Sequence, residues 1–151
     1  MEQEHNGRNP IRQENLAGCG LACVAFIVHK NYQVLVPLIK QEQIDLDYKG
    51  MFCRDIIKLL EQFGITAKLR YLRLQTDPLL SKEWVIAYVN RTAKYTAGHY
   101  LVRYQGKWMD SWINYPEIIK IRAGFRKKLP GKVNYVIDLV TKPIENIFPK
   151  V

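Results

Sequence analysis

The sequence predicts an α+β domain in which N-terminal helices pack on a mostly antiparallel sheet, because helical patterns come first and strand patterns follow. Up to Phe63, apolar residues recur at helical spacing, whereas from Ile65 onward short β-rich runs alternate with turn residues. The 151 residues fit one domain, and no repeat, low-complexity tract or linker divides them. We expect a polar, loosely held arm over residues 1–12 and a single domain over 13–151.

Three helices are predicted, over residues 18–30, 35–44 and 51–63. The first is apolar on most sides, which is typical of a buried helix. Pro37 breaks the second helix early, because proline lacks the N–H that a helix interior needs. The third carries one apolar stripe and ends before Gly64, a common residue at a helix C-terminus.

The second half of the chain reads as strands, over residues 65–74, 84–90, 99–104, 107–112, 117–122 and 133–141. Gln105 and Gly106 separate two of these runs and predict a two-residue hairpin turn. In that register His99 pairs with Trp112, so His99 and Asp110 lie on one face, diagonal neighbours with Cα atoms roughly 7 Å apart. A four-residue loop keeps this arrangement, and a three-residue loop reverses it.

The composition excludes several classes of protein. No apolar run reaches the ~18 residues of a membrane span, and residues 1–10 are too polar for a signal peptide. Three cysteines are an odd number, and Cys19 and Cys23 lie too close together in the sequence for a disulfide between them to stabilise the fold usefully. Free thiols in a reducing compartment fit better, so we expect a cytoplasmic protein.

The net charge is +9, and six of the basic residues fall within residues 120–132, where there is no acid. This basic segment could steer an acidic peptide or protein, or it could be a solvated edge that aids solubility. No nucleic-acid-binding motif accompanies it, so nucleic acid is not an expected partner. The sequence does not indicate an oligomeric state.

Cys19 is the candidate nucleophile. It falls in the first turn of the first predicted helix, where N–H groups and the helix dipole stabilise a thiolate. Gln13 precedes it by six residues, which lets its amide fold back as a second oxyanion donor beside the Cys19 N–H. His99 would serve as the base and Asp110 would orient it. Cys19 could otherwise be one more small buried residue.

Other candidates have simpler explanations. His5 and His29 are expected at the surface, and Cys23 in the core. A zinc site of Cys19, Cys23 and His99 has poor spacing and no clear fourth ligand. We therefore expect neither a metal nor a cofactor.

The pattern Gln13-x5-Cys19-Gly-x-Ala, followed by Gly98-His99-Tyr100 and Asp110, resembles the double-glycine leader peptidase domain of bacteriocin-exporting ABC transporters. The resemblance implies a papain-like fold and a thiol peptidase. By this resemblance, Gln13 would form the oxyanion hole, Cys19 would attack, His99 would be the base and Asp110 would orient His99. It also implies a peptide substrate with a small-residue, Gly-Gly-like cleavage site. Two positions differ from that family. The family usually has an acidic residue just before the cysteine, where this chain has Gly18, and a proline after the aspartate, where this chain has Ser111.

The hairpin from His99 to Asp110 is also similar to that of Josephin-type deubiquitinases, which are papain-like as well. Because no transporter segment follows residue 151, we expect a free-standing form. The same machinery can act as a deubiquitinase, or as a glutamine deamidase or transglutaminase. A catalytically silent peptide-binding domain is the non-enzymatic alternative.

Overall fold

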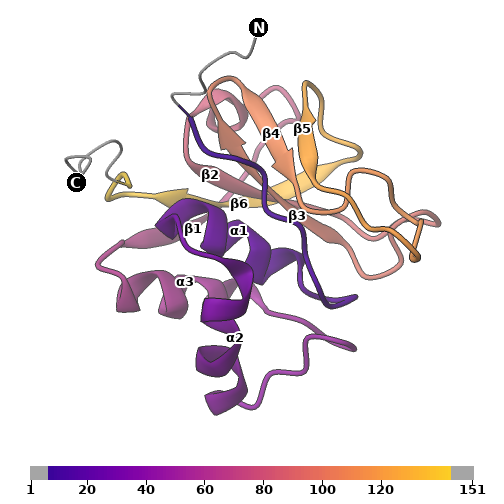
Figure 1. Ribbon diagram of the computed structural model, residues 1–151. Helices are drawn as coiled ribbons and strands as arrows, with labels where there is room; N and C mark the ends of the chain where they lie inside the picture. Colours follow the sequence, from indigo (N-terminus) through magenta and orange to yellow (C-terminus); the bar gives the residue numbers. More distant parts are fainter. Residues whose placement is uncertain (1–6, 144–151) are drawn as a thin grey trace, which may run out of the picture.

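The computed structural model describes residues 7–143 and confirms the α+β architecture, with three helices on one side of a six-stranded antiparallel sheet (Figure 1). The sheet order is β1-β6-β2-β3-β4-β5. Its strands are β1 (Ala67–Tyr71), β2 (Val85–Val89), β3 (His99–Tyr104), β4 (Lys107–Asp110), β5 (Gly124–Arg126) and β6 (Val133–Leu139). A short 3-10 helix, η1 (Pro78–Ser81), precedes β2.

The helices are α1 (Cys19–Val28), α2 (Tyr32–Gln41) and α3 (Cys53–Gln62). In α1 every residue from Gly20 to Ile27 is buried, as its uniformly apolar sequence predicts. Helix α2 continues through Pro37, so the predicted early break is wrong. Burial of Tyr32, Leu35 and Ile39 along one face offsets the hydrogen bond that proline cannot make.

The core lies on both faces of the sheet. Along β2, Ile86 points toward the helices, while Val85, Ala87 and Val89 belong to a second cluster on the opposite face. This alternation follows from the two-residue period of a strand.

The hairpin of β3 and β4 has the predicted register, with Tyr104 opposite Lys107 and Val102 opposite Met109. Gln105 and Gly106 both have positive φ values, 51° and 76°, as a type I′ turn requires. His99 begins β3 and Asp110 ends β4, so the turn sets the spacing between them.

The predicted strand over 117–122 is wrong, and the strand of this region is β5. The side chain of Asn114 donates to the Lys120 carbonyl and accepts from the Arg122 N–H, at 2.8 and 2.9 Å. These backbone groups are therefore satisfied within a loop instead of a sheet ladder.

Residues 7–12 lie against the domain, although they were expected to be loosely held. The Arg8 N–H donates to the Tyr104 hydroxyl at 2.9 Å, and its guanidinium lies 5.3 Å from the centre of the Trp84 ring. Ile11 packs against the main core. The predicted boundary at residue 13 stays a prediction, and residues 1–6 and 144–151 lie outside the described residues. Within residues 7–143, no single helix is long and apolar enough to cross a membrane.

Candidate active site

The four predicted site residues come from three parts of the chain. Gln13 lies in the loop before α1, Cys19 is the first residue of α1, and His99 and Asp110 lie at adjoining ends of β3 and β4. Cys19 is partly exposed, whereas Gln13, His99 and Asp110 are 1%, 3% and 0% exposed.

His99 and Asp110 form a buried pair. His99 Nε2 lies 2.7 Å from Asp110 Oδ1, which leaves Nδ1 of the ring for another partner. Burial lowers the pKa of His99, but hydrogen bonds with Asp110 and the Cys19 side chain, and their charges, raise it to about 9. The thiol of Cys19 is thus a neighbour of the imidazole, and the two residues meet across 80 positions of sequence.

Asp110 has two further partners. Its Oδ1 accepts the N–H of Trp112 at 2.9 Å, and its Oδ2 accepts Arg126 Nη1 at 3.2 Å. Burial raises the pKa of Asp110, but the hydrogen bond and charge of His99, the Trp112 N–H and the Arg126 guanidinium together lower it. The carboxylate is therefore held ionised in a buried position.

A tyrosine covers the imidazole. The ring of Tyr95 stacks on that of His99, with centroids 5.1 Å apart and planes inclined by 6°. Tyr95 is itself 2% exposed, and its ring centroid lies 4.7 Å from that of Tyr115. This stacking limits the rotation of His99 out of line with Asp110.

Gln13 is held by the residue after Asp110. Its Oε1 accepts the Ser111 hydroxyl at 2.7 Å, and its backbone N–H donates to the Ser111 carbonyl at 3.2 Å. Its Nε2 donates to the carbonyls of Asn15 and Leu16, at 3.0 and 3.1 Å, in the loop that leads to Cys19. The amide therefore presents its nitrogen end toward the loop before Cys19.

The glycines beside Cys19 have packing roles. A Cβ at Gly18 would collide with the hydroxyl of Tyr32, and a Cβ at Gly20 would lie 3.1 Å from Ile56 Cδ1. Gly18 is the N-cap of α1 and has no side chain that could bond to the N–H groups of the first turn.

Sequence reasoning missed Tyr95, Ser111 and Arg126. Arg126 was counted in the basic segment, but on β5 it pairs with Trp108 and reaches Asp110 from the same face of the sheet. With a strand misplaced at 117–122, nothing in the sequence pointed to that contact.

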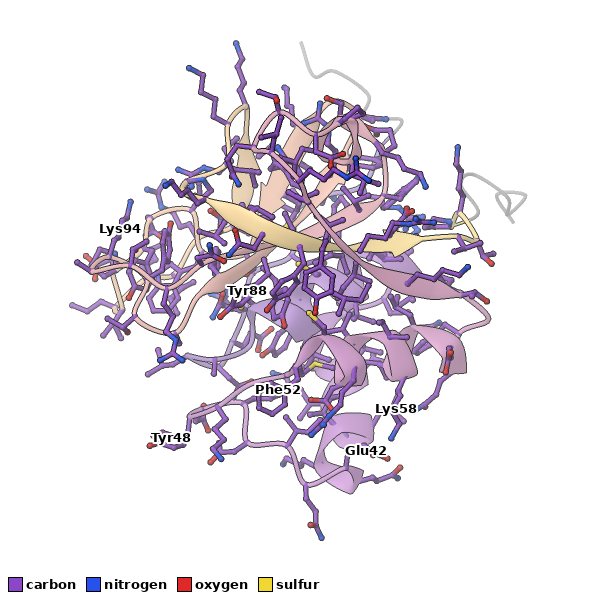
Figure 2. The ribbon with its side chains drawn as sticks, turned by 180° about the vertical axis from the view of Figure 1, so that it is seen from behind. Glu42, Tyr48, Phe52, Lys58, Tyr88 and Lys94 are labelled. Atoms are coloured by element: carbon purple, nitrogen blue, oxygen red, sulfur yellow. The ribbon has the colours of Figure 1, made fainter. Side chains whose placement is uncertain are left out.

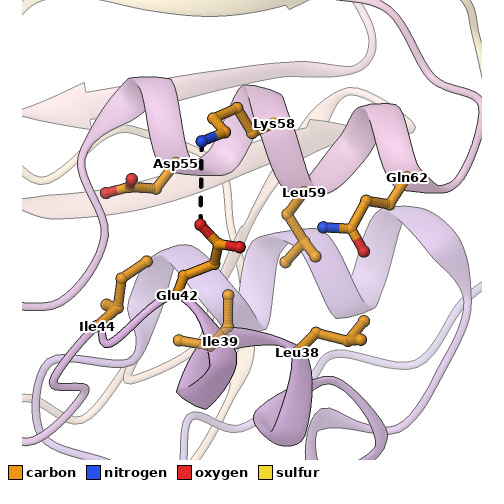
Figure 3. Close-up of a pocket in the computed structure, with 8 residues that line it drawn as sticks. All are labelled: Leu38, Ile39, Glu42, Ile44, Asp55, Lys58, Leu59 and Gln62. Carbon is orange, nitrogen blue, oxygen red and sulfur yellow. Dashed lines mark ion pairs between the residues drawn. The ribbon is translucent and has the colours of Figure 1, made fainter.

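A separate depression lies between α2 and α3 (Figure 3). It is shallow and is lined by apolar residues such as Leu38 and Leu59, with Glu42 and Lys58 paired at an N–O distance of 3.9 Å. None of the four predicted site residues lines it, so it is distinct from the Cys19 site. Among the described residues, no group of three or more His, Cys, Asp or Glu is placed to hold a metal ion.

The chain is similar to known proteins in sequence and in fold. A family model described as the peptidase C39 family matches residues 8–128. The chain belongs to the peptidase C39 family. It is accordingly a cysteine peptidase, a hydrolase that uses a thiol. No curated protein matches the chain by sequence.

Two solved structures share the C39 fold. One is a double glycine motif protease from an AMS/PCAT transporter in complex with the leader peptide, at 15% identity and a TM-score of 0.53, covering 91% of this chain and 95% of that one. The other is the peptidase domain of Streptococcus ComA, a bi-functional ABC transporter of a quorum-sensing pathway. It has 15% identity and a TM-score of 0.58, and covers 91% and 99% of the two chains.

Proposed function

We propose that Cys19, His99 and Asp110 form the catalytic triad of this C39 peptidase. The observation that carries the proposal is the buried His99–Asp110 pair, 2.7 Å apart, beside a partly exposed cysteine at a helix N-terminus. A raised pKa keeps His99 protonated at neutral pH, which favours a thiolate–imidazolium pair.

In this mechanism the thiolate of Cys19 attacks the scissile carbonyl carbon, and a C–S bond forms. As the C–N bond breaks, His99 gives its proton to the leaving amine. Water then loses a proton to His99 and attacks the thioester, which releases the acid and restores the thiolate. Asp110 keeps the imidazole aligned throughout both steps.

The oxyanion is stabilised by the Cys19 N–H and the Gln13 amide. The Cys19 N–H lies at the positive end of α1, and Gly18 adds no capping side chain. Gln13 Nε2 donates to the carbonyls of Asn15 and Leu16, so in this mechanism the substrate oxygen replaces one of these carbonyls as the acceptor.

We infer a small-residue, Gly-Gly-like cleavage site, and the double glycine motif protease among the structures that share this fold supports it. The hydroxyl of Tyr88 donates to the Ala97 carbonyl at 3.0 Å, and a Cβ at Gly98 would collide with this hydroxyl. Tyr88 also lies near Cys19. Burial is the main cause that raises the pKa of Tyr88, and the charge of Cys19 raises it further. Tyr88 and Lys94 from the sheet half lie on the same side of the molecule as Tyr48 and Phe52 (Figure 2). Tyr88 fills the space beside Gly98, the residue that precedes His99.

The substrate is a peptide or protein, and the leader-peptide complex of the AMS/PCAT protease supports a peptide. A net charge of +9 favours acidic segments in it. All three cysteines are free thiols, which supports action in the cytoplasm.

The test uses a peptide that ends in Gly-Gly joined to aminomethylcoumarin, with an Ala-Ala peptide and a ubiquitin vinyl sulfone probe beside it. Cys19→Ala and His99→Ala should abolish release of the fluorophore, whereas Cys53→Ala should retain it. Gln13→Ala should lower turnover by about 10²–10³, the usual effect of one oxyanion donor. Full activity in Cys19→Ala would overturn the triad, and labelling by the ubiquitin probe alone would favour a deubiquitinase.

A further inference from the structure

We propose that Ser111 is a positioning residue that fixes the Gln13 amide, so that the adjacent residues Asp110 and Ser111 align both the base and the oxyanion donor. The proposal rests on the function proposed for Gln13. It adds a residue that does not touch the reacting atoms but determines how the amide is presented.

Two hydrogen bonds join Ser111 to Gln13. The hydroxyl donates to Gln13 Oε1 at 2.7 Å, and the carbonyl of Ser111 accepts the Gln13 N–H at 3.2 Å. Both residues are buried, with 0% and 1% of their surfaces exposed. Buried polar groups need partners, so the hydroxyl satisfies an oxygen that water does not reach.

The orientation matters because the two ends of an amide have opposite effects on an oxyanion. An oxygen turned toward the developing negative charge would repel it, whereas an N–H stabilises it. Here the Ser111 hydroxyl holds the oxygen end while the carbonyls of Asn15 and Leu16 accept from the nitrogen end. A flipped amide would face these two carbonyls with its own oxygen, so the network excludes the flipped amide and keeps the nitrogen end toward the loop before Cys19.

The chain geometry explains why consecutive residues serve both halves of the site. Asp110 is the last residue of β4 and reaches His99. Ser111 begins the turn that follows β4 and reaches the loop before α1. Movement of this strand end would displace the base and the oxyanion donor together.

The first test is a double-mutant cycle of Ser111→Ala and Gln13→Ala on the Gly-Gly coumarin peptide. Ser111→Ala should lower kcat about 10-fold, less than removal of the whole amide, with KM unchanged. The double variant should equal Gln13→Ala, because the hydroxyl acts only through that amide. Exposed Ser81→Ala is the control and should match wild type.

Two further readouts separate this proposal from the triad. The rate of Cys19 alkylation by iodoacetamide should be unchanged in Ser111→Ala, since His99 and Asp110 remain in place. The ¹⁵N NMR signals of the Gln13 side-chain amide should shift in Ser111→Ala. A folded Ser111→Ala protein with unshifted Gln13 signals, or losses that multiply in the double variant, would overturn the role of Ser111. Loss of selective Cys19 alkylation in wild type would instead overturn the triad.

Discussion

At the residue scale, the site is marked by polar groups that are buried together. Among the described residues, six polar or charged residues are buried: Arg8, Gln13, His99, Asp110, Ser111 and Asp138. Four of them, Gln13, His99, Asp110 and Ser111, lie in the candidate active site and bond to one another in two pairs. Burial of such groups costs free energy unless they are paired, and chemistry is the usual reason to retain them.

Asp110→Asn should move the basic limb of the pH–rate profile to lower pH. Burial lowers the pKa of His99, but Asp110 and Cys19 together raise it to about 9, and the hydrogen bond to Asp110 is the largest of the raising effects. Without the carboxylate the pKa falls, so His99 loses its proton, and the thiolate loses its partner, at lower pH. Activity should be reduced but measurable near neutral pH, and lower still in Asp110→Ala.

The measurement is kcat/KM from pH 5 to 10 for wild type and both variants. Asp138→Asn is a matched control, because this buried carboxylate pairs instead with Arg70 and Lys82 at 2.9 and 2.6 Å. It should lower stability without shifting the limb. An unshifted limb in Asp110→Asn would mean that Asp110 does not set the proton affinity of His99.

Cys19 should react with iodoacetamide much faster than the other two cysteines at neutral pH. It is partly exposed, begins α1 and adjoins protonated His99. Burial raises the pKa of both Cys23 and Cys53, so few of their thiols are ionised. Peptide mapping after brief labelling gives the three rates, and equal labelling would contradict Cys19 as the nucleophile.

At the scale of elements, the hairpin could be predicted correctly from the sequence because local rules govern it. A two-residue turn fixes the register of β3 and β4, and the register fixes which face His99 and Asp110 share. The helices were placed correctly from their apolar faces, apart from Pro37. Their ends were predicted one to three residues away from those observed.

The errors arose where contacts of particular side chains decide the structure. Residues 117–122 have strand-like composition, but the Asn114 side chain binds their backbone and forms a loop. The partners Tyr95, Ser111 and Arg126 reach the site through strand pairing and loop packing, which one sequence does not encode as a spacing. Residue types that could catalyse were visible in the sequence, whereas the residues that hold them were not.

Gly18→Ala should destabilise the junction of α1 and α2. The added methyl group would collide with the hydroxyl of Tyr32, which donates to Asn15 Oδ1 at 2.8 Å. Overpacking of this kind costs about 1–3 kcal/mol of unfolding free energy. Chemical denaturation measures the loss.

Tyr32→Phe provides the matched partner for a double-mutant cycle. Alone it should cost about 1 kcal/mol, the value of one hydrogen bond. Combined with Gly18→Ala it should recover part of the stability, because the colliding oxygen is gone. Strictly additive losses would show that the collision is relieved elsewhere.

At the scale of the molecule, the fold joins the start of a buried helix to the end of a sheet. Helix α1 packs against β3, α2 and α3, so Cys19 is fixed relative to His99 by the main core (Figure 1). The charge is less concentrated than the sequence indicated. Arg126 turns inward to Asp110, while Lys120 and Arg122 lie in the loop after Trp112, and Lys127 and Lys128 follow β5.

The loop that carries Lys120 and Arg122 adjoins the site, because Tyr115 contacts Tyr95, whose ring stacks on His99. For an acidic peptide, Lys120→Glu with Arg122→Glu should lower kcat/KM and flatten its dependence on salt, with kcat unchanged. Lys127→Glu with Lys128→Glu changes the net charge equally but lies in the segment after β5, so its effect should be smaller. Stopped-flow binding and turnover between low and moderate salt measure both pairs. Equal effects would mean that net charge alone steers the substrate, and an unchanged salt profile in both would make the basic segment a solvated edge. A larger effect for the loop pair would place the acidic part of the substrate beside His99.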